Sequence, residues 1–142
     1  MIYQHFNLID VMTATENIII GQSNSFFMNK KVLAQKIRNL SDKYELGIDP
    51  NKCDCDMSVG EKQTLEIIKV LYRGAKILIL DEPTAVLTPQ EIKKLFKIIR
   101  NMKEQGCAVI IITHKLNEVM EISDRITVLR KGNSIGTVVT SD

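Results

Sequence analysis

The chain has 142 residues, which is enough for one domain or part of one. It is 44% hydrophobic and 25% charged, and its formal net charge of +2 gives no electrostatic reason to expect nucleic acid as a main partner. No apolar run is long enough to span a bilayer, and Met1–Asp10 lacks the basic-then-apolar pattern of a signal peptide, so the sequence predicts a cytoplasmic protein.

The front half is predicted to be helical. Thr13-Ala14-Thr15-Glu16 has the pattern of a capping box and predicts a short helix that ends at Gly21. A second helix is predicted from apolar residues at helical spacing, with Gly47 as its C-terminal cap; these residues are Leu33, Ile37, Leu40 and Tyr44. Ser58-Val59-Gly60-Glu61 is another capping box and predicts a helix that ends near Gly74.

The three cysteines are Cys53, Cys55 and Cys107. Their odd number and the tight spacing of Cys53 and Cys55, which is shorter than in usual zinc sites, favour free thiols in a reducing compartment.

Strands and helices alternate in the back half. The apolar runs Ile77–Leu80 and Ala108–Ile112 predict strands buried on both faces, and Thr88-Pro89-Gln90-Glu91 predicts the start of the helix between them. A helix over 115–122 and a third strand over 125–129 follow, and a hairpin turn at 130–133 leads into a returning strand over 134–139. This order predicts an α/β fold, in which a parallel sheet with flanking helices (residues 75–142) lies beside an α-helical subdomain (residues 1–74).

Polar residues follow both predicted parallel strands. Asp81 and Glu82 end the first strand, and His114 follows the second. Ligands bind beyond the carboxyl ends of parallel strands, so these side chains are expected at one edge of the sheet, although acidic residues that simply end a strand and a histidine that caps one are common. Ser58 and Gly60 likewise suit either a plain helix cap or an anion site at a helix N-terminus.

Together these motifs resemble the ATPase domain of ATP-binding-cassette (ABC) transporters, a P-loop NTPase fold. Asp81-Glu82-Pro83-Thr84 resembles the Walker B segment, Ser58-Val59-Gly60-Glu61 the signature loop, Thr113-His114 the switch histidine, and Tyr3-Gln4-His5 the Q-loop. The four motifs stand in the family's order. The residues 65–90 and 124–126 most resemble cassettes of sugar- or nucleoside-importing transporters, of the kind found first in a tandem pair.

The resemblance implies a role for each of these residues, with ATP and Mg²⁺ as cofactors. Asp81 would hold magnesium through water, Glu82 would be the general base, and His114 would touch the terminal phosphate. Gln4 would sense magnesium and water and relay to the membrane subunit. Ser58 and Gly60 would reach ATP bound to a second, facing cassette. The partners implied are that second cassette and transmembrane permease subunits, at the inner face of the cell membrane.

The chain departs from the family pattern in its phosphate-binding loop and its signature. It contains no Gly-x-x-x-x-Gly-Lys-Ser/Thr segment, the Walker A loop, which in family order precedes Gln4. Loss of three hydrogen bonds to charged groups removes about 4.5–9 kcal/mol, or roughly three to six decades of affinity, so the chain alone is expected neither to bind ATP usefully nor to hydrolyse it. Val59 and Glu61 replace the usual Gly and Gln, and Thr88 stands where the family often has Asp.

Two other functions remain open from the sequence. One is a soluble cassette ATPase acting on DNA or ribosomes, against which the balanced charge argues. The other is a non-enzymatic α/β interaction module in which Asp81, Glu82 and His114 merely cap strands.

Overall fold

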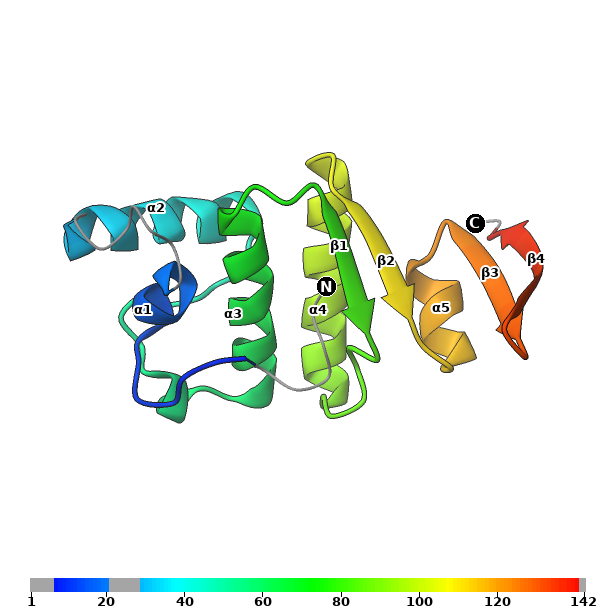
Figure 1. The fold of residues 1–142 in the computed structure, drawn as a ribbon, viewed down its shortest axis with the longest axis horizontal. Coiled ribbons are helices and arrows are strands. Elements are labelled where there is room, and N and C mark those ends of the chain that lie inside the picture. The colour runs from blue at the N-terminus through cyan, green and yellow to red at the C-terminus, as the bar shows by residue number, and fades with distance from the viewer. Residues whose placement is uncertain (1–6, 21–28, 141–142) are drawn as a thin grey trace. The chain divides into compact units, whose positions relative to one another are not determined.

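The computed structural model describes residues 7–20 and 29–140, and Figure 1 shows how their helices and strands are arranged. The chain divides into two compact units, residues 1–112 and 113–142. This division follows the contacts within the chain. The expected division into a helical subdomain (1–74) and a sheet with flanking helices (75–142) stays a prediction.

The capping boxes found in the sequence start the helices of the first unit. Helix α1 (Ala14–Ile19), α3 (Val59–Tyr72) and α4 (Pro89–Glu104) each begin after a Ser or Thr whose side-chain oxygen accepts a hydrogen bond from a backbone N–H three residues later. In all three, the glutamate at that later position bonds back to the backbone of the capping residue, so the predicted reciprocal pattern is confirmed. Helix α2 (Lys30–Lys43) begins after Asn29, whose side chain accepts from the N–H of Lys31.

The end of α2 corrects one prediction, because Gly47 does not cap this helix. The left-handed residue that ends α2 is Glu45, with φ 53°, and Gly47 takes its own positive φ two residues later in the loop. The N–H of Glu45 donates to the carbonyl of Asp42 and that of Leu46 to the carbonyl of Ser41, which is the Schellman arrangement. Leu46 is fully buried, and this burial offsets the cost of placing a glutamate in the left-handed region.

Helix α3 lies at the centre of the first unit. It contacts α1, α2 and α4, and most of its side chains are buried, with Leu65, Ile67 and Ile68 fully so. A short 3-10 turn, η1 (Asp54–Asp56), precedes it. Because this helix is surrounded by packed elements, its sequence is apolar on more than one side.

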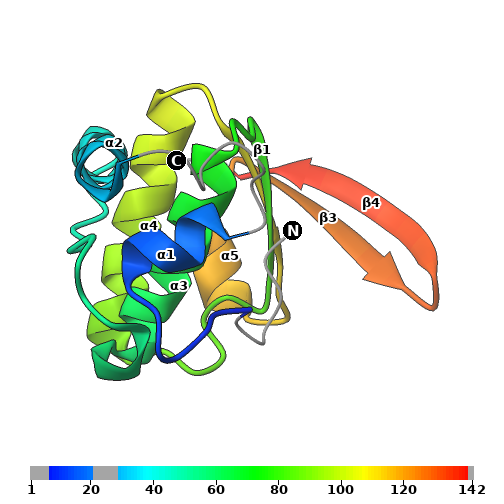
Figure 2. The same ribbon diagram turned by 60° about the vertical axis from the view of Figure 1, so that its left-hand side comes forward.

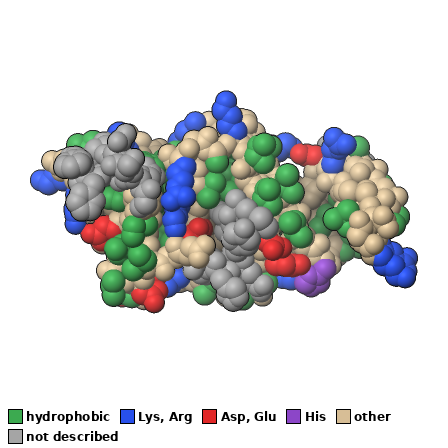
Figure 3. Space-filling model, viewed as in Figure 1, with side chains coloured by type: hydrophobic (Ala, Val, Ile, Leu, Met, Phe, Trp, Pro, Cys, Tyr) green, Lys and Arg blue, Asp and Glu red, His purple; other side chains and the backbone are tan. Residues whose placement is uncertain are grey.

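Strands β1 (Ile77–Asp81) and β2 (Ala108–Ile112) form a two-stranded parallel sheet in register from Ile77↔Ala108 to Asp81↔Ile112. The parallel pairing with α4 as the connection is as predicted, but burial on both faces is not. Leu78 and Leu80 are buried, whereas Ile77, Ile110 and Ile112, on the opposite face, are 48–61% exposed. Helices α3 and α4 lie on one side of the sheet (Figure 2), and hydrophobic side chains are visible at the surface over the strands (Figure 3).

The second unit comprises α5 (Leu116–Ile122), β3 (Arg125–Arg130) and β4 (Asn133–Val139). The predicted hairpin is confirmed, since β3 and β4 pair antiparallel around Lys131 and Gly132, both with positive φ. Within this unit β3 and β4 form a two-stranded sheet of their own, and continuation of the parallel sheet by the third strand stays a prediction. A two-residue turn brings β4 back beside β3 directly, so this pairing requires no distant partner.

Candidate functional site

The acidic pair lies at the carboxyl end of the parallel sheet. Asp81 is the last residue of β1 and pairs with Ile112, the last residue of β2. The backbone N–H of Glu82 donates to the carbonyl of Ile112 at 2.9 Å, so the two strand ends stay joined one residue beyond the sheet. Both acidic side chains are half-buried. This edge of the sheet therefore presents two adjacent carboxylates, at the strand end where the sequence predicted Asp81 and Glu82.

Glu82 has an unusual backbone conformation for a residue with a side chain. Its φ is 45°, in the left-handed region, which costs a non-glycine residue roughly 1–2 kcal/mol. The turn that follows holds it there: the N–H of Ala85 donates to the carbonyl of Glu82 at 3.2 Å, and Thr84 is buried. The functional role expected for Glu82 stays a prediction.

The remaining members of the expected cluster are His114 and Gln4. His114 follows Ile112 by two residues and belongs to the second unit, so its convergence with Asp81 and Glu82 stays a prediction. Gln4 lies outside the described residues.

Ser58 and Gly60 form a turn at the start of α3, and the structure shows what occupies it. One carboxylate oxygen of Glu91, Oε1, accepts from the hydroxyl of Ser58 and from the backbone N–H of Gly60, each at 3.2 Å. The other oxygen, Oε2, accepts from Thr88 within the capping box of α4. A single side chain therefore links the N-termini of two helices, and a carboxylate occupies the donors expected to meet phosphate.

Glu91 was expected only to cap its own helix. Its contacts with Ser58 and Gly60 join residues more than thirty positions apart, and no pattern in the sequence indicates them. Hydrogen bonds from Thr88, followed by those from Gly60 and Ser58, lower the pKa of Glu91, so the occupant of the turn is an ionised carboxylate at neutral pH.

The turn opens into a small hollow of about 50 Å³, whose walls include Ser58, Gly60, Thr64, Leu87 and Lys94. Gly60 is needed for the close approach of Glu91, because an added Cβ would lie 2.7 Å from its Oε1. The walls also include Glu61 and Glu91, so the hollow sets a hydroxyl, a backbone N–H and a lysine beside two carboxylates.

Glu61, which replaces the usual glutamine of the signature, is also committed to local contacts. Its carboxylate accepts from the backbone N–H of Ser58 and from Lys52 Nζ, each at 2.8 Å. The Lys52 ammonium is the main cause of the lowered pKa of Glu61. Two ionised carboxylates therefore flank Ser58, and both must be accommodated by any anion that approaches this turn.

Asp81 has the donor chemistry that magnesium requires. Magnesium prefers oxygen ligands and keeps several waters, and Asp81 offers a half-buried carboxylate at the strand end. The residues present at this edge therefore fit the ion.

Comparison with known proteins agrees with this geometry. Residues 1–85 match the model of a family described as ABC transporter. The nucleoside import ATP-binding protein NupA of Lactococcus lactis is 49% identical over the whole chain, and the guanosine import ATP-binding protein NupO of Bacillus subtilis is 51% identical. The chain spans only 28% of the length of each of these two relatives.

The fold is also that of a solved cassette. The structure of cbiO1 from Clostridium perfringens, part of the ABC transporter complex cbiONQ, superposes with a TM-score of 0.77 at 26% identity. The superposition covers 92% of this chain and 52% of cbiO1. The predicted partial P-loop NTPase fold is thereby confirmed, and the chain belongs to the ABC transporter family.

Proposed function

We propose that this chain is a segment of an importer's ATP-binding subunit. The segment carries the signature turn (Ser58 and Gly60), the acidic strand end (Asp81 and Glu82) and the switch histidine (His114). The observation that carries the proposal is the pair Asp81-Glu82 at the end of a parallel sheet, in a chain of the ABC transporter family. The cargo class is a nucleoside or a sugar, and identity of 49–51% with two nucleoside importers favours a nucleoside.

In this function each residue has a separate task. Asp81 would hold Mg²⁺, which would neutralise charge on the phosphates when bound. Glu82 orients and polarises the attacking water, and His114 contacts the terminal phosphate. Gln4 senses the ion and the water and relays their state to a permease.

Ser58 and Gly60 donate to ATP held by a second cassette. Because both donors bind Glu91, its carboxylate has to leave them before a phosphate reaches the turn. The family implies that the subunit works at the inner face of the cell membrane, docked on transmembrane permeases. Among the helices in the described ranges, none is both long and apolar enough to cross a bilayer.

A chimera tests the proposal. Residues 1–142 replace the matching segment of NupA. Nucleoside uptake is then measured in cells that lack their own NupA. We expect uptake with the unaltered segment and its loss with Glu82→Gln, because a carboxamide does not activate water; single catalytic groups of this kind contribute about 10²–10⁴-fold.

Glu104→Gln is the matched control. It makes the same chemical change at an exposed residue at the end of α4, away from the site. If Glu82→Gln supports full uptake, the ATPase role is wrong and the interaction module is favoured instead.

A further inference from the structure

A cluster of metal-ligating side chains lies outside the nucleotide site, on the turn before α3. The Sγ atoms of Cys53 and Cys55 and a carboxylate oxygen of Asp56 all lie within 4.8 Å of one another. The two sulfur atoms are 2.8 Å apart. These residues are near neighbours in the sequence, and the fold of the turn brings their three ligand atoms together.

The backbone of this turn is held by contacts with residues 10–13. Cys53 pairs with Thr13 in an isolated antiparallel bridge. The N–H of Asp54 donates to the carbonyl of Met12 at 2.9 Å, and that of Cys55 to the carbonyl of Asp10 at 3.0 Å. The ligand side chains are therefore carried by a backbone already ordered by the preceding segment, so little entropy is lost when they bind an ion.

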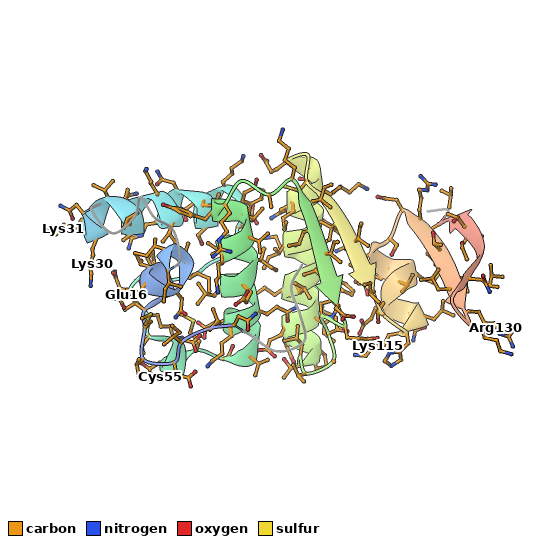
Figure 4. The ribbon with its side chains drawn as sticks, viewed as in Figure 1. Glu16, Lys30, Lys31, Cys55, Lys115 and Arg130 are labelled. Carbon is orange, nitrogen blue, oxygen red and sulfur yellow. The ribbon has the colours of Figure 1, made fainter. Side chains whose placement is uncertain are left out.

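Asp54 sets the direction of its neighbours. Its side chain is fully buried and accepts from Lys62 Nζ at 2.8 Å, so it anchors the turn inward. Cys53 is half-exposed, while Cys55 and Asp56 are exposed; Figure 4 shows Cys55 at the outer edge of the ribbon. The cluster is thus open to solvent on one side.

The donor set selects a class of cation. Two thiolates and one carboxylate suit Zn²⁺, whereas Mg²⁺ and Ca²⁺ prefer sets made of oxygen alone. Tetrahedral zinc with Zn–S bonds near 2.3 Å places two sulfurs about 3.8 Å apart, so the pair at 2.8 Å would open by about 1 Å. Open solvent on the outer side leaves room for a fourth ligand.

We propose that Cys53, Cys55 and Asp56 bind a thiophilic divalent cation of the zinc class, with water as the fourth ligand. Binding forms two metal–sulfur bonds and one metal–oxygen bond and releases the thiol protons to solvent. One of these protons is the Cys53 S–H now donated to the carbonyl of Asp10 at 3.1 Å. The site is independent of ATP and of the proposed import function.

The reduced 142-residue chain is titrated with Co²⁺, whose sulfur-to-metal charge-transfer absorption reports thiolate ligands, and Zn²⁺ is then added in competition. We expect one ion per chain and displacement of Co²⁺ by Zn²⁺. Cys53→Ser and Cys55→Ser should each weaken binding by about tenfold or more, and Asp56→Asn by a smaller factor, because sulfur is the stronger ligand. Cys107→Ser is the matched control and should change nothing, since Cys107 is buried and outside the cluster.

A second measurement does not depend on any variant folding. Zn²⁺ should slow alkylation of Cys53 and Cys55 by iodoacetamide in the unaltered chain, with the sites identified by mass spectrometry. The proposal is overturned if Zn²⁺ leaves their alkylation rates unchanged or if the reduced chain gives no charge-transfer absorption. Co²⁺ binding that survives both cysteine substitutions would overturn it as well.

Discussion

At the scale of single residues, the candidate site includes a residue, Glu82, whose backbone conformation is unfavourable. Glu82 occupies the left-handed region directly after a strand, a conformation that glycine adopts without steric cost. A carboxylate at this position therefore costs the folded chain free energy, because its Cβ is unfavourable at this φ. That cost is measurable, because removing the Cβ removes it.

We expect Glu82→Gly to unfold at a higher urea concentration than Glu82→Ala. The two variants lack the same carboxylate and differ only in the Cβ that clashes at φ 45°, so glycine should be more stable by roughly 0.5–1 kcal/mol after its greater unfolded-state entropy is counted. Greater stability of Glu82→Ala than of Glu82→Gly would show that the backbone at Glu82 carries no strain, because only the entropy cost of glycine would then remain.

Glu16 gives a residue-scale prediction for pH. Hydrogen bonds from Lys30 and from Thr13 lower its pKa from 4.5 to about 2, and Figure 4 shows Glu16 and Lys30 close together at the start of the chain's helical part. A carboxylate with a lowered pKa in the folded state contributes stability that is fully present above pH 4.5 and is lost as the pH falls toward 2.

Unfolding free energies of the unaltered chain and of Glu16→Gln should therefore differ at neutral pH and converge between pH 4.5 and about 2. Urea unfolding at a series of pH values measures the difference. A gap that persists unchanged at pH 2 would mean that the ionised carboxylate is not the source of the stabilisation.

At the scale of elements, α3 and α4 are joined at their N-termini by Glu91. The two helices begin thirty residues apart, and both the signature turn and the loop after the acidic pair lie at this junction. A movement of Glu91 therefore affects both segments at once. The close fit of Gly60 against this side chain allows the link to be cut from either side.

A double-mutant cycle of Gly60→Ala and Glu91→Ala measures this link. In the unaltered chain, Gly60→Ala adds helix propensity but pushes the Glu91 carboxylate off the turn. In the Glu91→Ala background, Gly60→Ala has only the gain in helix propensity. We expect a coupling of about 1 kcal/mol in chemical unfolding, the value of a partly exposed hydrogen bond to a charged group. Additive effects would show that the contact contributes nothing to stability.

At the scale of the whole chain, the main feature is an apolar sheet face without cover among the described residues. Ile77, Ile110 and Ile112 lie on this face, 48–61% exposed, on a sheet of only two strands. Uncovered apolar surface and free strand edges favour association between chains.

The 142-residue chain is expected to self-associate as its concentration rises in sedimentation velocity, and Ile110→Lys should shift it toward the monomer. Val86→Lys is the matched control, because Val86 is 59% exposed in the loop after β1 rather than on the strands. A chain that stays monomeric at every concentration contradicts the prediction, as does an equal effect of both lysines.

The sequence by itself determined what depends on neighbours along the chain. The capping boxes at Thr13, Ser58 and Thr88, the turn at Lys131-Gly132 and the order of helices and strands were all readable, since caps and turns bond within four residues. The family, too, follows from short motifs in order.

Only the tertiary structure decided which distant groups meet. It placed Glu91 on the signature turn and left one face of the β1–β2 sheet open. It also put Glu45 in the left-handed position that follows the cap of α2, where burial of Leu46 outweighs the preference for glycine. Local patterns carry no record of such contacts, because burial and long-range hydrogen bonds are properties of the packed chain.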